Sequence, residues 1–404
     1  MNLQNLNFKR RLFNPQTPKQ TRPASALWAL GFRPMFLAGS LGAFGLMLLW
    51  ILFLLKGPHP VLSRSPALWH AHEMIFGFGG AIIAGFLLTA SANWANQKGV
   101  SGPRLIFLAG LWSAARILPL TGLNPLLGLG AELGFWLWLG WLLRPTLQGR
   151  NRIFWLLLSL ILVADTLASL ELAGVALGNI SQSGMIGIQL AVTLVISMIV
   201  LIAGRVLPFF AEKALPGLQI VRKPRLDHLA LGVTLAFALA QLLLPHSGWT
   251  AALALLAGGI HLFRWQIWQP WQSRKIPILW ILYLGYAWVI LGFFLQGLAA
   301  LEWVSRSTAT HAWTAGAMGT FIYGMVSRVS LGHTGRPIQA SGPIFVGYLL
   351  LTLAVVLRLF AAVFPGSSAF LLAAAGILWL LAFGLLLLVF LPIWTRPRID
   401  GKPG

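Results

Sequence analysis

Long hydrophobic runs dominate the chain, each of about 20 residues and separated by short polar segments or segments containing Pro and Gly. A run of this length crosses the hydrocarbon core of a bilayer as one α-helix. The pattern therefore predicts an all-α polytopic membrane bundle of about twelve transmembrane helices, with no soluble domain between them. The predicted spans are 35–55, 69–92, 104–121, 125–143, 153–176, 184–207, 228–245, 250–268, 277–298, 309–330, 343–363 and 369–391.

Basic residues lie mainly on one side of this topology. Of the 29 Lys and Arg residues, 24 fall on one side of this topology: before the first span, after the last span, in the even-numbered loops or at the span ends beside those loops. By the positive-inside rule this side is cytoplasmic, so we expect both termini to be cytoplasmic. The net charge of +21 then reflects topology and not nucleic-acid binding. We expect a basic cytoplasmic tail with an amphipathic start over 1–27, one membrane domain over 28–392 and a second tail over 393–404.

Composition limits the chemistry. The chain has no Cys, which excludes disulfides and thiolate metal sites, so any metal must be bound by His, Glu, Asp or Met. Only 9% of the residues are charged. An ionisable side chain inside a span is costly and is therefore a candidate for function. These candidates are His70, His72, Glu73, Arg116, Glu132, Asp165, Glu171, His261, His311 and Arg358.

The second and tenth predicted spans share a pattern of residues 239 positions apart, and each is followed by the tripeptide SGP. A duplication would relate helices eight apart and would suit units of four helices. The span between them, 184–207, lacks the pattern, so chance agreement of small residues is the alternative. The shared pairs are His72 and His311, Gly77 and Gly316, Gly80 and Gly319, Gly85 and Gly324, and Ser91 and Ser330.

The segment WHAHEM, residues 69–74, is the strongest candidate for a site. Its span and that of His311 both enter from the outer side, so we expect the imidazoles of His72 and His311 to converge near that face. His70 is turned by about 200° from His72 on a helix and would face elsewhere. Haem iron and copper both accept imidazole; the alternative is a hydrogen-bonded structural or proton-relay pair. Glu73 would orient a ligating imidazole or cap the helix.

Glycines and a second motif extend this hypothesis. The glycine faces of the two spans would admit a flat macrocycle, or would simply serve helix packing. At the inner end of the tenth span, the segment RVSLGHTGRP places Arg328, His333 and Arg336 at the cytoplasmic surface. There they could bind haem propionates, another anion or lipid phosphates, or act only as a basic anchor. His333 lies about 33 Å along the helix from His311, so the two cannot share an ion.

Several motifs resemble the signature stretches of the NnrS family, in order and across nearly the whole chain. They are GFRPMFL (31–37), WHAHEMIFGF (69–78), AGFLLTA (84–90), AGRVLPFF (203–210), HAWTAGAMGT (311–320) and RVSLGHTGRP (328–337). The resemblance implies a bacterial inner-membrane protein that carries haem and copper and helps cells tolerate nitric oxide. It makes His70, His72, His311 and His333 the metal-ligand candidates, and adds Arg33 to the candidate cofactor-binding residues.

Three functions fit these observations. The first is ligand binding or electron transfer at a His-ligated metal centre. The second is secondary transport of a small anion or metal species along a path lined by Arg116, Glu132 and Asp165. The third is a scaffold for other enzymes of nitric oxide metabolism. The residues do not define a reaction, an electron donor or an oligomeric state.

Overall fold

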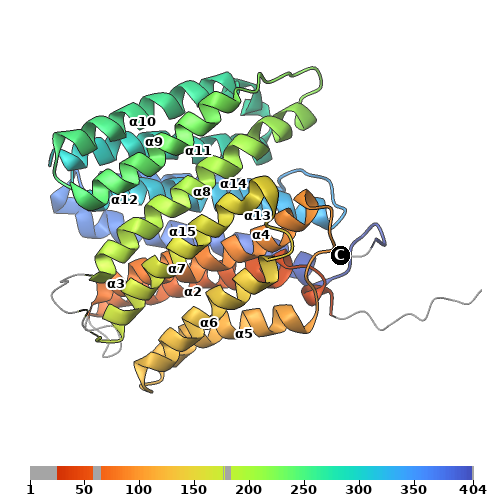
Figure 1. Cartoon of the computed structure of the whole chain (residues 1–404), viewed down its shortest axis with the longest axis horizontal. Helices are drawn as coiled ribbons and strands as arrows, with labels where there is room; N and C mark the ends of the chain where they lie inside the picture. Colours follow the sequence, from red (N-terminus) through yellow and green to blue (C-terminus); the bar gives the residue numbers. More distant parts are fainter. Residues whose placement is uncertain (1–24, 58–64, 176, 178–182, 403–404) are drawn as a thin grey trace, which may run out of the picture.

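The computed structural model describes residues 25–57, 65–175, 177 and 183–402, and these residues form helices, turns and loops without a strand (Figure 1). The predicted all-α class is confirmed. Twelve long helical segments follow one another in the described chain when stretches joined by a π-helix are counted together. They are α2 (Phe32–Lys56), α3 (Pro66–His72) with η2 (Glu73–Gly79) and α4 (Gly80–Trp94), α5 (Pro103–Ile117), α6 (Pro125–Leu143), α7 (Ile153–Leu172), α8 (Ser183–Ala214), α9 (Pro224–Leu243), α10 (Gly248–Ile267), α11 (Pro277–Ala300), α12 (Arg306–His311) with η6 (Ala312–Gly319) and α13 (Thr320–His333), α14 (Gly342–Phe360) and α15 (Ser368–Thr395).

Ten of these segments are long and apolar enough to cross a membrane. The other two, α10 and the α12–η6–α13 segment, occupy the positions of predicted spans and pack against α11. The protein is therefore a multi-pass helical membrane protein. Which side is cytoplasmic stays a prediction, and residues 1–24 of the predicted tail lie outside the described part of the chain.

The two described ends of the chain meet at one end of the bundle. A guanidinium nitrogen of Arg33, at the start of α2, donates to the carbonyl oxygens of Trp394 at 3.0 Å and Arg396 at 2.8 Å, at the end of α15. An even number of crossings brings the ends to the same side, as the predicted topology requires.

Helix starts follow from the local sequence. Pro occupies the first turn of α3, α5, α6, α9 and α11, where its missing N–H leaves no hydrogen bond unmade. Side chains cap other helices: Asn124 accepts from the N–H of Leu126, and Ser305 accepts from the N–H of Thr308. The polar punctuation between hydrophobic runs therefore sets the boundaries of the helices.

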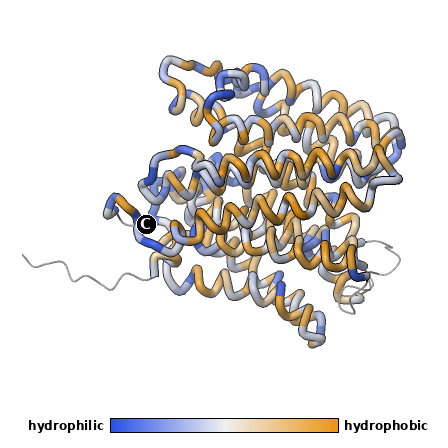
Figure 2. Tube along the Cα trace, turned by 180° about the vertical axis from the view of Figure 1, so that it is seen from behind, coloured by the Kyte–Doolittle hydropathy of each residue, from blue (hydrophilic) through white to orange (hydrophobic). Residues whose placement is uncertain are grey.

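Hydrophobic residues line the lengths of the helices, and hydrophilic residues gather at their ends (Figure 2). Many large apolar side chains are exposed along the outer helices, such as Phe370 and Leu388, each 74% exposed. A lipid bilayer is the solvent that such a surface fits. Exposed Trp249 and Trp271 lie at helix boundaries, as expected for interfacial anchors.

Both helices of the shared sequence pattern change to a π-helix directly after the histidine. The π-helical stretch η2 begins at Glu73, after His72, and η6 begins at Ala312, after His311. The two stretches keep the 239-residue offset of the sequence pattern. π-Helical stretches are rare and concentrate at functional sites, so this shared feature favours a common origin and directs attention to both histidines.

Candidate metal centre

His72 lies at the end of α3 and is 5% exposed. Its Nδ1 is 3.0 Å from Oε1 of Glu73, the next residue in the chain. Its Nε2 is 3.0 Å from both Oδ1 of Asp165 and Oγ of Ser169, on α7. Asp165 and Ser169 are four residues apart and so share one face of their helix. Both ring nitrogens of this imidazole are therefore held in place by polar side chains.

Arg116 of α5 and Glu132 of α6 complete the cluster. Nε of Arg116 is 2.9 Å from Oε2 of Glu73, and an Nη of Arg116 forms an ion pair with Glu132. The indole N–H of Trp136 donates to Oδ2 of Asp165 at 2.5 Å. All of these side chains are buried, although they come from four helical segments. The helices thus enclose a connected network of charged groups, which is costly unless it is fully paired.

The network contains a donor set for a metal ion. Ligand atoms of His72, Glu132 and Asp165 lie within 4.8 Å of one another, and all three residues are buried. When ionised, the three carboxylates of the network exceed the charge of Arg116 by two negative charges if the imidazole is neutral. A divalent cation would balance this excess. One imidazole and two carboxylates form a nitrogen and oxygen donor set that suits first-row divalent metals, including Cu(II).

Glu73 has the geometry of a residue that supports a metal ligand. A neutral imidazole carries one N–H and one lone pair. If Nδ1–H of His72 donates to Glu73, the lone pair is on Nε2 and faces Asp165. A carboxylate that accepts from the second nitrogen fixes the ring and raises its basicity. This contact supports the orienting role of Glu73 and not the alternative of a helix cap.

The structure gives His72 and His311 different hydrogen-bond partners. His311 has Nδ1 2.7 Å from the carbonyl oxygen of Ser307 and 3.0 Å from a guanidinium nitrogen of Arg358 on α14. No described hydrogen bond or ring contact joins it to His72. The ring of His70 stacks on Trp50, with centroids 4.4 Å apart. His70 and His72 thus face different neighbours, as their helical spacing predicts.

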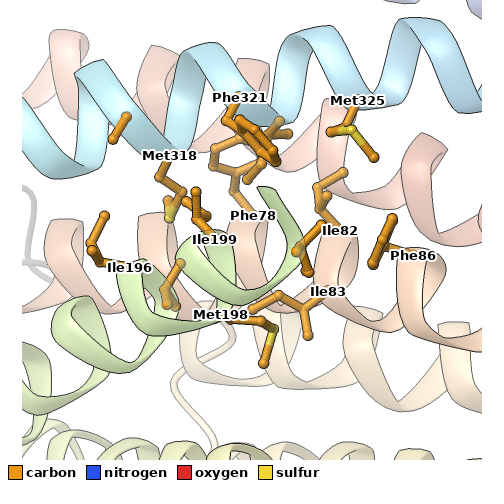
Figure 3. Packing of buried hydrophobic residues seen from close by; sticks show 14 of the residues in the cluster. Phe78, Ile82, Ile83, Phe86, Ile196, Met198, Ile199, Met318, Phe321 and Met325 are labelled. Atoms are coloured by element: carbon orange, nitrogen blue, oxygen red, sulfur yellow. The ribbon is translucent and has the colours of Figure 1, made fainter. Parts of the chain in front are cut away.

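The predicted macrocycle site between the glycine faces is occupied by protein side chains. A Cβ added at Gly80 would lie 3.2 Å from the ring of Trp136, and one at Gly319 would lie 2.8 Å from the ring of Trp379. Between the two helices, apolar side chains form a packed cluster with α8 (Figure 3). Haem does not fit on these faces. Labelled members of the cluster include Phe78, Ile82, Ile199, Met318, Phe321 and Met325.

The residues predicted at the inner face lie near the end of α15 but make different contacts. Arg33 donates to carbonyl oxygens at the end of that helix. The guanidinium of Arg328 lies 3.8 Å from the ring centroid of Phe210. The carbonyl oxygen of His333 accepts from Arg398 at 2.8 Å. Arg336 is partly exposed, and desolvation and Arg396 lower its pKa. These contacts show structural roles for Arg33 and His333; their cofactor and metal roles stay predictions.

A second buried polar group lies in α9, α10 and α11. Nδ1 of His261 is 2.7 Å from the hydroxyl oxygen of Tyr286, and Nε2 is 3.0 Å from Oγ1 of Thr234. Arg264 donates to the same Tyr286 oxygen at 2.7 Å and to Asp227 at 2.8 Å. Both ring nitrogens of His261 therefore have protein partners. This arrangement supports the structural alternative for His261 over a ligand role.

Sequence reasoning grouped Arg116, Glu132 and Asp165 along one possible path but did not predict direct contact between His72 and Asp165. A hydrogen bond from Ser, Thr or Trp to Asp165 was an alternative, but Ser169 and Trp136 were not identified. The available signal was the spacing of Asp165 and Ser169, which puts two polar groups on one face of an apolar helix. The helix that packs against the Asp165 and Ser169 face cannot be read from this spacing, because the packing joins segments far apart in the chain.

The fold and the site together define a class: a multi-pass α-helical membrane protein with a buried His, Glu and Asp group that could hold a metal ion. Comparison with protein families agrees with the motifs. The family model described as NnrS protein matches residues 26–398, nearly the whole chain. The chain belongs to the NnrS family. No curated protein matches it.

Proposed function

We propose that the protein is an NnrS-type metalloprotein of the bacterial inner membrane that helps the cell withstand nitric oxide. We assign its copper to His72, Glu132 and Asp165. The observation that carries this assignment is the convergence of these three buried side chains from separate helices to within 4.8 Å. A bound copper ion would supply a centre for binding a small ligand or for transferring one electron.

The residues around this set have distinct tasks in the proposal. His72 offers Nε2 as a ligand and keeps its ring orientation through Nδ1 and Glu73. Trp136 holds the second carboxylate oxygen of Asp165, which leaves Oδ1 directed at the imidazole. Arg116 balances part of the negative charge without competing for the metal, because a guanidinium donates but does not ligate. Burial excludes water from the site.

Haem is implied by the family resemblance, and the proposal places none between the glycine faces. The predicted ligand imidazoles left for an axial role are His70, His311 and His333, all only partly buried. An absorption spectrum of the purified protein tests this directly. A haem band that is lost in His311→Ala and kept in His72→Ala would separate the haem ligand from the proposed copper ligand.

Metal content tests the copper assignment. We expect one copper per chain in the purified protein, measured by mass spectrometry, and at least tenfold weaker retention in His72→Ala and Asp165→Asn, in line with the roughly 10–100-fold effects of disturbing metal sites. His246→Ala is the matched control, because His246 is exposed and pairs with Glu302 at the surface. Cells in which the His72→Ala variant replaces the wild-type protein should also lose tolerance to a nitric oxide donor. Full copper content in both site variants would contradict the assignment.

A second candidate function is transport of a proton or small cation through the same network. It is favoured because Arg116, Glu132 and Asp165, the residues predicted to line a path, meet at His72. Flux into proteoliposomes distinguishes the two functions. A protein without metal that carries a proton current lost in Asp165→Asn supports transport, whereas tightly bound copper without flux supports the metalloprotein.

A further inference from the structure

Arg358 near the end of α14 lacks a carboxylate partner. One of its Nη atoms donates to Oγ of Ser307 at 2.8 Å and lies 3.0 Å from Nδ1 of His311. The same Nδ1 is 2.7 Å from the Ser307 carbonyl oxygen. A ring nitrogen cannot donate to a carbonyl and accept from a guanidinium at once. When Nδ1–H of His311 donates to the carbonyl oxygen of Ser307, Arg358 donates only to the Ser307 hydroxyl. Most of its guanidinium N–H groups then remain available for a ligand.

No acidic side chain of the protein pairs with this guanidinium. All eight acidic side chains of the sequence lie in the described part of the chain. None of them forms an ion pair with Arg358 there. Seven have basic partners or contacts with a hydrogen-bond donor elsewhere, and Glu171 accepts from the backbone N–H of Gly184 at 2.7 Å. A carboxylate or other anion at Arg358 must therefore come from outside these side chains.

Comparison with the helical segment of His72 shows which group is absent near Arg358. There, the residue after His72 is Glu73, and it pairs with Arg116 from the next helix, α5. In the second, the residue after His311 is Ala312, and Arg358 comes from the next helix, α14. Both arginines thus follow their histidine helix by one helix, and both histidines precede a π-helix. The second segment has a cation and an imidazole but no carboxylate at the position after the histidine.

We infer that Arg358, His311 and Ser307 form a binding site for a small planar oxyanion or carboxylate. The fork of a guanidinium matches two oxygens of such a group. Ser307 is exposed, and Arg358 and His311 are partly exposed, so the proposed site is open at the surface of the protein. This site shares no residue with the proposed copper site and does not depend on it, although His311 is also a candidate axial haem ligand.

Titration calorimetry on the purified full-length protein tests the site, with sodium nitrite, sodium formate and sodium butyrate as probes and sodium chloride as the reference salt. We expect one saturable site per chain. Arg358→Gln should weaken binding about tenfold or more, because a charge-assisted hydrogen bond is lost. Arg358→Lys should bind the probes with an affinity between those of wild type and Arg358→Gln, because lysine keeps the charge but not the forked geometry. Arg306→Gln is the matched control, since this arginine contacts His246 instead.

The probes also separate two sources of the anion. Nitrite and formate binding more tightly than butyrate indicates a free small oxyanion, and the reverse order indicates the carboxylate of a larger molecule. The inference is overturned if no probe saturates the wild-type protein, or if Arg358→Gln binds as well as wild type. An equal loss in Arg306→Gln would also overturn it, because the effect would then be one of surface charge alone.

Discussion

The helix that carries His72 and the helix that carries His311 share a backbone design but differ in charge. Each has a histidine followed at once by a π-helical stretch, and each is followed by a helix with an arginine. Around His72 the arginine pairs with Glu73 and Glu132. Around His311 the position after the histidine is Ala312, and Arg358 has no carboxylate partner among the acids of the chain.

Burial follows the charge balance. The first site is closed, and its acidic groups are partly balanced by Arg116, which lowers the cost of burying charge in a membrane interior. The second site has an excess of positive charge and stays partly open to solvent. One backbone arrangement can therefore support a sealed donor set for a cation and an accessible receptor for an anion. The residue after the histidine selects between them.

The largest expected effect is a difference in protein stability between substitutions of Arg116 and Arg358. Arg116→Leu leaves Glu73 and Glu132 buried without a cation and should lower the free energy of unfolding by about 3–5 kcal/mol. Arg358→Leu removes no ion pair and should change it by less than about 1 kcal/mol. Thermal unfolding of both variants in the same detergent provides the measurement. Equal losses would show that the two sites do not differ in the way proposed here.

Two equivalent glycines sharpen the comparison. A methyl group at Gly77 would lie 3.0 Å from Oε2 of Glu73 and 3.1 Å from an Nη of Arg116, whereas one at Gly316 would lie 3.0 Å from the ring of Trp288. Both substitutions overpack, at a cost of about 1–3 kcal/mol. Only Gly77→Ala displaces the carboxylate that orients His72, so only it should reduce copper retention, by about tenfold. If Gly77→Ala retains as much copper as Gly316→Ala, Glu73 does not support the metal site.

Much of the fold could be predicted from the sequence because a bilayer imposes a simple rule. Each hydrophobic run of sufficient length must satisfy its backbone internally, which leaves a helix. The spans predicted to begin at 69, 104 and 125 correspond to helices that begin at Pro66, Pro103 and Pro125. Hydrophobicity alone does not report helix rotation, because lipid-facing and buried positions are equally apolar. The identity of neighbouring helices therefore stayed outside what the pattern could predict.

The candidate site shows the same limit. Helical spacing predicted that His70 and His72 face apart, and the structure agrees. It did not predict that His72 faces α7, since Asp165 lies 93 residues away in sequence. The glycine faces were equally ambiguous: a small residue leaves room for a cofactor or for a neighbouring side chain. Here Trp136 fills that room at Gly80, which only the packed structure can show.

The last prediction restores the missing anion. Ala312→Glu places a carboxylate after His311, as Glu73 follows His72, and this carboxylate should pair with Arg358. Internal pairing would compete with nitrite or formate, so we expect about tenfold weaker binding of these probes in calorimetry, equivalent to about 1.4 kcal/mol. Ala312→Gln is the control of similar size without charge. If Ala312→Gln weakens binding as much as Ala312→Glu, bulk at this buried position explains the loss. If only Ala312→Glu weakens binding, the added carboxylate pairs with Arg358 as Glu73 pairs with Arg116.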